Sequence, residues 1–225
     1  EVDDKASNAI EKKQYVVESN TVTIKAGERV AKFRMKGIYE NIDKTDSLSV
    51  TFNLLAKDEN VWDLYGTRTR VQMQKACPFE LSTFEGYCLL TSSFFSAYMT
   101  NTEHRLLQAE RDKTEDNTII LHDFFYKNYD LKIKYDPSDP LKPFVEFDDQ
   151  IIGSTAEAFG TIYGNGKLMC TQPVAYDSYY NVCQKFVFLY STIYVVGKGT
   201  VGTYVNILEW ISDEEAEQYK KEEGL

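Results

Sequence analysis

Long apolar segments and catalytic signatures are both missing from this sequence. No run approaches the roughly 18 apolar residues that a membrane-spanning helix needs. The longest candidate, Phe186–Val196, is interrupted by tyrosine, serine and threonine. We therefore predict no transmembrane segment. The Walker A loop, the H-E-x-x-H and G-x-S-x-G motifs and the EF-hand loop are also absent, and this excludes several common nucleotide, protease, hydrolase and calcium-binding classes.

Positive charge is in deficit, with 25 Lys and Arg against 35 Asp and Glu and a net charge of −10. A surface that binds phosphates needs clustered Lys and Arg, so nucleic acid is excluded as a partner. An acidic surface keeps a protein soluble, and this is the simplest interpretation of the charge. A basic partner protein is the alternative.

Histidine is scarce, since the chain has only His104 and His122. Glu146 and Asp148 would share one face of a strand and could bind a hard cation, but a solvated strand face is the favoured explanation. His122 lies beside Asp123, which favours a hydrogen-bonded structural histidine. We predict no metal site and no cofactor.

The chain has four cysteines and no C-x-x-C pair: Cys77, Cys88, Cys170 and Cys183. Two local disulfides, Cys77–Cys88 and Cys170–Cys183, would each close a short loop, but three connectivities are possible and four free buried thiols are the alternative. The chain opens at Glu1 without an initiator Met, which is typical of a processed terminus. A secreted or organelle-lumenal location after removal of a targeting segment is therefore favoured, although no N-glycosylation sequon supports it.

Aromatic residues and glycine-punctuated β patterns dominate what is present, with 16 Tyr and 13 Phe. Runs of β-branched and aromatic residues fill Phe144–Trp210. Gly164-Asn165-Gly166 and Gly197-Lys198-Gly199 supply the positive φ angles that tight hairpins need. No βαβ alternation occurs. We predict an all-β chain that forms a single antiparallel barrel of about eight to ten strands, with a β-sandwich as the second choice.

No Pro-, Ser- or Gly-rich linker divides the chain, so one barrel domain is expected over 15–211, after an N-terminal arm over 1–14. A short acidic helix is expected over 212–225, because Ser212 and Glu215 form a capping box. A second helix signal covers Thr100–Asp112, where N-cap residues precede a short apolar stripe, and a helical turn between strands is the alternative.

Two segments carry a resemblance to known proteins. Asp148–Leu168 resembles the Gly-rich turn and following strand of allene oxide cyclases and dirigent proteins, which share a small eight-stranded barrel. Phe84–Leu90 is similar to the cyclase strand that carries a cysteine into the barrel cavity. The resemblance implies an isomerase or cyclase that acts on a lipid-derived or aromatic substrate. It would place Cys88 in the cavity, with Glu40 and Asn41 as the nearest candidates for the charge-stabilising group.

The aromatic content without catalytic motifs favours a non-catalytic role over this enzymatic one. One hypothesis is a barrel that binds a hydrophobic small molecule, since such cavities are apolar with few polar groups. Its candidate ligand-binding residues are Tyr87, Phe94, Phe186, Phe188 and Tyr190. The other is an interaction or structural subunit that docks on a partner protein or on a second copy of itself.

Overall fold

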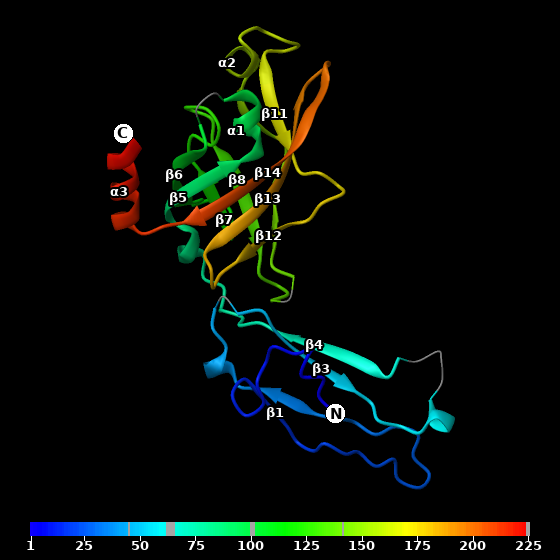
Figure 1. Ribbon diagram of the computed structural model, residues 1–225. Helices are drawn as coiled ribbons and strands as arrows, with labels where there is room; N and C mark the ends of the chain where they lie inside the picture. Colours follow the sequence, from blue (N-terminus) through cyan, green and yellow to red (C-terminus); the bar gives the residue numbers. More distant parts are fainter. Residues whose placement is uncertain (45, 62–65, 100–101, 141, 224–225) are drawn as a thin grey trace. The chain divides into compact units, whose positions relative to one another are not determined.

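A computed structural model describes residues 1–44, 46–61, 66–99, 102–140 and 142–223 (Figure 1). The chain is mostly antiparallel strand and forms two compact units, Glu1–Ala76 and Cys77–Leu225. Each unit has its own buried apolar core. This division differs from the single domain expected over 15–211. The strands of each unit pair only with one another, and no linker composition marks the boundary between them.

The first unit contains two small antiparallel sheets. β1 (Tyr15–Val17) pairs with β2 (Met35–Gly37), and β3 (Leu48–Asn53) pairs with β4 (Arg68–Met73). Apolar side chains from the sheets and the adjoining loops form one core, which contains Ala9, Tyr15, Ile42, Leu48 and Val50. Two 3-10 turns, η1 (Tyr39–Asn41) and η2 (Asp58–Asn60), lie in the connections.

The N-terminal residues are bound to this unit, although the sequence predicted an arm over 1–14. The backbone N–H of Asp3 donates to the carbonyl of Thr51 over 2.9 Å, and the N–H of Asn8 donates to the carbonyl of Ser49 over 3.0 Å. These bonds occupy one edge of β3. The segment therefore acts as a partner for that strand without forming a regular strand itself.

The second unit is a closed eight-stranded antiparallel barrel, which confirms the predicted fold class. Around the barrel its strands are β5 (Gly86–Ser92), β6 (His104–Arg111), β7 (Thr118–Leu121), β8 (Leu131–Asp136), β9 (Phe144–Glu146), β12 (Ser178–Asn181), β13 (Phe186–Val195) and β14 (Gly199–Trp210). β14 closes the barrel by pairing with both β13 and β5. The β13–β14 turn contains Gly197 at φ 74° and Gly199 at φ 110°, as the predicted hairpin requires.

Two further strands extend one side of the barrel. β10 (Gln150–Ser154) and β11 (Lys167–Thr171) form a hairpin, and β11 pairs with the C-terminal half of β13. The N-terminal half of β13 pairs with β12 instead. β9 and β10 therefore follow one another in one strand position of the sheet, and β11 and β12 do so in the next position. In each position a short irregular stretch separates the two strands.

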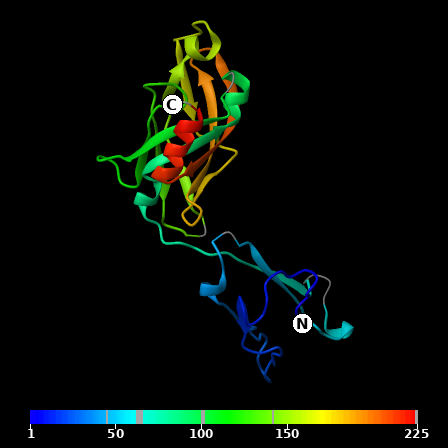
Figure 2. The same ribbon diagram turned by 60° about the vertical axis from the view of Figure 1, so that its left-hand side comes forward.

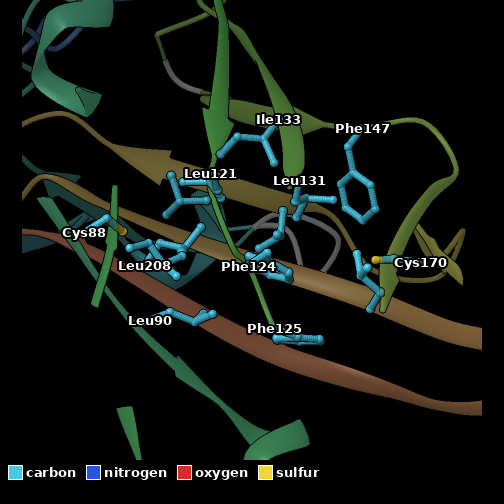
Figure 3. Packing of buried hydrophobic residues seen from close by; sticks show 14 of the residues in the cluster. Cys88, Leu90, Leu121, Phe124, Phe125, Leu131, Ile133, Phe147, Cys170 and Leu208 are labelled. Atoms are coloured by element: carbon cyan, nitrogen blue, oxygen red, sulfur yellow. The ribbon is translucent and has the colours of Figure 1, made fainter. Parts of the chain in front are cut away.

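The barrel interior is a packed core (Figure 3). Side chains from strands on all sides meet there, and Leu90, Leu121, Phe124, Leu131 and Leu208 have no surface accessible to water. A void wide enough for a water molecule would give its lining side chains accessible surface. Eight strands enclose a space that side chains alone can fill. The interior of this barrel is filled in that way.

In the described part of the chain, three short helices accompany the barrel. α1 (Ser93–Tyr98) continues directly from β5, and α2 (Thr155–Phe159) continues from β10. α3 (Asp213–Glu223) follows β14 and contacts β5 (Figures 1 and 2). The predicted capping box of α3 is confirmed, because the Glu215 N–H donates to Ser212 Oγ over 3.2 Å and the Ser212 N–H donates to Glu215 Oε2 over 2.8 Å. Residues 224–225 of the predicted helix lie outside the described residues. No helix in the described ranges is both long and apolar enough to span a bilayer.

The helix predicted over Thr100–Asp112 is wrong. Residues 100–101 lie outside the described residues, and His104–Arg111 form strand β6. Leu107 and Ala109 are buried while Gln108 and Glu110 are exposed, which is the alternation of a strand. Pairing with β5 overrides the local helix signal.

One disulfide joins Cys77 to Cys183, and Cys88 and Cys170 are free and buried. Both local pairs considered from the sequence, Cys77–Cys88 and Cys170–Cys183, are therefore wrong. The bond connects the start of the second unit to the turn between β12 and β13. Cys88 and Cys170 behave as the small buried hydrophobes of the alternative interpretation.

Candidate functional site

The residues suggested by the cyclase resemblance occupy different environments. Cys88 lies on β5 inside the packed barrel, where burial raises the pKa of its thiol well above its ordinary value and a backbone hydrogen bond at Glu209 only partly opposes this. Glu40 and Asn41 lie in η1 of the first unit and are exposed, and Asn41 Nδ2 donates to the carbonyl of Lys13 over 2.7 Å. Among the described residues Asp112 is the one buried carboxylate, and it is hydrogen-bonded by Thr114 and Lys132.

Two of the predicted ligand-binding residues have structural contacts instead. Tyr87 lies beneath α3, where Lys220 Nζ donates to the Tyr87 hydroxyl over 2.9 Å and lies 4.3 Å from the ring centroid. Phe94 is fully buried in α1 and stacks on Phe125, with ring centroids 4.7 Å apart. Tyr87 therefore anchors the C-terminal helix, and Phe94 belongs to the core.

The other three predicted residues do come together, but on the outside of the barrel. Along β13 the buried side chains are those of Val187, Leu189, Ser191, Ile193 and Val195. Phe186, Phe188 and Tyr190 occupy the alternate positions and are only partly buried. Because side chains alternate between the two faces of a strand, these rings point away from the interior.

Two tyrosines that the sequence analysis did not select complete the group. Tyr179 on β12 is paired directly with Phe188, and their rings stack at 5.4 Å with planes 11° apart. Tyr176, in the loop between β11 and β12, stacks on Tyr190 at 4.9 Å with planes 21° apart. We call Tyr176, Tyr179, Phe186, Phe188 and Tyr190 the aromatic ladder.

The ladder is continuous from one end to the other. The ring of Tyr179 also lies 6.1 Å from that of Phe186, and the ring of Phe188 lies 5.2 Å from that of Tyr190. Tyr176 is 52% exposed and Tyr179 is 40% exposed, so the row is open to solvent. Alternation along β12 could have found Tyr179, because Ser178 and Tyr180 on either side of it are buried. Tyr176 precedes the strand, so alternation gives no signal for it.

Polar groups accompany the rings and have no internal partner. No described residue hydrogen-bonds the hydroxyls of Tyr176, Tyr179 or Tyr190. Asp177, next to Tyr176, is exposed and makes no ion pair within the described ranges. Glu209, directly across from Phe186 on β14, is exposed as well. The ladder thus combines apolar ring surface with hydroxyl and carboxylate groups that remain available to a ligand.

The histidines have local partners. His122 Nδ1 is 3.0 Å from Asp130 Oδ2, and His122 Nε2 is 3.5 Å from Glu110 Oε2. This confirms the imidazole–carboxylate contact expected of a structural histidine, although the partner is Asp130 and not Asp123. Among the described residues, no group of three His, Cys, Asp or Glu side chains is placed to hold a metal ion.

An open depression of about 1040 Å³ lies beside α1 and α2, and His104 lines it. His104 Nδ1 is 2.8 Å from Thr91 Oγ1. A hydroxyl paired with an imidazole is part of an activated nucleophile, which also needs a group that orients the ring. No described carboxylate contacts the His104 ring, so this pair lacks the orienting group.

Comparison with family models finds one match, described as "Domain of unknown function (DUF4984)", over residues 64–222. The matched range includes β4 and almost all of the second unit. Searches of curated proteins and of solved structures find no match.

Proposed function

This chain belongs to the DUF4984 family, and we propose that its barrel is a non-catalytic binding domain whose ligand docks on the aromatic ladder. The observation that carries the proposal is the ladder itself: five rings in continuous contact, four on the outer face of β12 and β13 and one in the loop before β12. Aromatic side chains supply large contact areas at little cost in conformational entropy. They are also enriched among the residues that dominate binding energies.

Because the barrel interior is packed, the proposed binding site lies on the outer surface of the barrel. A hydrophobic small molecule inside the barrel would need a cavity, and the side chains that face inward already fill the space. A ligand therefore has to bind on an external surface. The ladder is a cluster of partly exposed aromatic side chains, and a contiguous exposed apolar patch is typical of a binding surface.

The disulfide supports a location in an oxidising compartment. Disulfides persist in secreted, periplasmic and lumenal proteins and are rare where cellular thiols stay reduced. Cys77–Cys183 thus favours a secreted or lumenal location.

No contact among the described residues favours the cyclase alternative. A thiol that takes part in chemistry needs access to substrate and a lowered pKa, whereas Cys88 is fully buried with a raised pKa. The binding proposal therefore stands without a second candidate function.

Nuclear magnetic resonance of the full chain tests the proposal. Oligosaccharides, proline-rich peptides and a long-chain fatty acid are added in turn, and the expected result is that one class shifts the signals of residues 178–181 and 186–190. The double variant Tyr179→Ser/Phe188→Ser should lose that response. Tyr163→Ser, which removes an exposed ring outside the ladder, should keep it. Shifts confined to other surfaces, or no shifts with any class, would reject the proposal.

A further inference from the structure

The ladder offers two kinds of interaction at the same place. Its rings are apolar, whereas its three tyrosine hydroxyls have no hydrogen-bond partner in the described part of the chain. The exposed Asp177, which follows Tyr176 directly in the chain, makes no hydrogen bond there either. A ligand that covers these groups without bonding them would leave them desolvated, which is costly. A suitable ligand therefore needs apolar faces for the rings and hydrogen-bonding groups around its rim.

The shape of the ladder favours an elongated ligand. Phe186, Phe188 and Tyr190 stand at every second position of β13, so the row spans roughly 14 Å at about 3.4 Å per residue. Tyr176 stacks on Tyr190, the last ring of this row. A single small ring would contact only part of this row, whereas a chain of rings would contact all of it.

We infer that the ligand is a carbohydrate chain lying along β13 over the aromatic ladder, an inference that rests on the proposed function. A pyranose ring has one face of C–H groups, which packs on an aromatic ring, and a rim of hydroxyls. Those hydroxyls both donate and accept hydrogen bonds. They match the Tyr hydroxyls, which do the same, and the Asp177 carboxylate, which only accepts.

Other ligand classes match the ladder less well. A hydrocarbon chain would leave Asp177 and the tyrosine hydroxyls without partners. An anionic ligand would meet Asp177 and Glu209, in a chain of net charge −10. A proline-rich peptide also docks on rows of aromatic rings. Its prolines have no N–H, so it offers fewer hydrogen-bond donors than a sugar chain in which every unit has hydroxyls.

Isothermal titration calorimetry of the full chain with a panel of neutral hexasaccharides tests the inference. The panel contains β-1,4-linked glucose, mannose, xylose and N-acetylglucosamine, and α-1,4-linked glucose. At least one should bind, and its affinity should exceed that of the corresponding monosaccharide because the longer chain covers more rings. Tyr176→Ala and Tyr179→Ala should each weaken binding by about tenfold or more, the scale of a central contact residue.

Matched variants separate the ring from the polar groups. Tyr179→Phe keeps the ring and removes the hydroxyl, so it should retain more affinity than Tyr179→Ala. Asp177→Asn should weaken binding, and Tyr163→Ala should leave it unchanged. Equal thermal unfolding temperatures would show that every variant folds.

The outcomes distinguish the two proposals. If no saccharide binds but a proline-rich peptide shifts the ladder signals, the carbohydrate inference is overturned and the binding proposal stands. If no probe binds at the ladder, both are rejected. Saccharide binding that survives Tyr176→Ala and Tyr179→Ala would also overturn the inference, because the sugar would then lie elsewhere.

Discussion

The side-chain amide of Gln150 takes the place of a strand beside Lys132. The Lys132 N–H donates to Gln150 Oε1, and Gln150 Nε2 donates to the carbonyl of Lys132, both over 2.8 Å. This pair joins β10 to β8 at the point where β9 has ended. One side chain thus hydrogen-bonds both the N–H and the carbonyl of Lys132, which have no strand partner there because β9 has ended.

Replacing Gln150 should weaken the barrel on this side. We expect Gln150→Ala to lower the free energy of unfolding by roughly 1–3 kcal/mol, because the backbone groups of Lys132 lose both partners. Urea unfolding measures the change. Gln108→Ala, at an exposed position of β6, is the control and should stay within about 0.5 kcal/mol of the parent. Equal stability of the two variants would mean that water replaces the amide without cost.

Strand alternation predicted the barrel but not which face of β13 lies inside. Both sets of alternate positions in Phe186–Val195 are mostly apolar or aromatic, so alternation does not show which set faces the core. The larger rings were assigned to the interior. Pairing on both edges of β13 instead buries the smaller Val187, Leu189 and Ile193. Phe186, Phe188 and Tyr190 were therefore expected inside the barrel, whereas they lie on its outer face.

Other features depended on contacts distant in sequence. Spacing alone could not select Cys77–Cys183 from the possible pairings, because the two residues are 106 positions apart. The boundary at Ala76 has no compositional mark either. In contrast, the capping box of α3 depends only on Ser212 and Glu215, three residues apart, and was predicted correctly.

The Cys77–Cys183 disulfide should contribute strongly to the stability of the second unit. It closes a loop of more than a hundred residues, and loss of a native disulfide typically costs about 2–5 kcal/mol. We expect the double variant Cys77→Ser/Cys183→Ser to unfold at lower urea concentration by an amount in this range. Reductant should destabilise the parent and leave the double variant unchanged. A parent that resists reductant while its disulfide is shown to be reduced would contradict this prediction.

The buried thiols should make the protein less stable at alkaline pH. Burial raises the pKa of Cys170 from 9.0 to about 12, and the hydrogen bond with Ser191 only partly opposes this. Above pH 9 the unfolded chain releases the thiol proton while the folded chain retains it. The contribution of this group is therefore complete below pH 9 and is lost progressively as the pH rises towards 12.

Urea midpoints at about pH 8 and about pH 10.5 measure the effect. Cys170→Ala removes the group, so the variant should lose less stability between the two pH values than the parent does. Tyrosines titrate in both proteins and cancel in the comparison. The same slope in parent and variant would show that Cys170 already ionises at its ordinary pKa in the folded protein. A thiol reagent should likewise react with Cys88 and Cys170 only after unfolding.

Asn206 connects three strands inside the barrel, and its removal should be among the most destabilising changes. Its Oδ1 accepts from Ser92 Oγ over 2.6 Å, and its Nδ2 donates to Ser191 Oγ over 2.8 Å and to the carbonyl of Leu189 over 3.0 Å. The side chain has no accessible surface, so water cannot replace these partners.

We expect Asn206→Leu to lower the free energy of unfolding by about 3 kcal/mol or more, since each buried polar group left without a hydrogen-bond partner costs about 1–3 kcal/mol. Asn206→Asp should also destabilise the barrel, because it places a charge where only hydroxyls and a carbonyl surround it. Thr200→Ala, at an exposed position of the same strand, provides the control. A loss below about 1 kcal/mol in Asn206→Leu would mean that the core repacks around the leucine and that these bonds add little net stability.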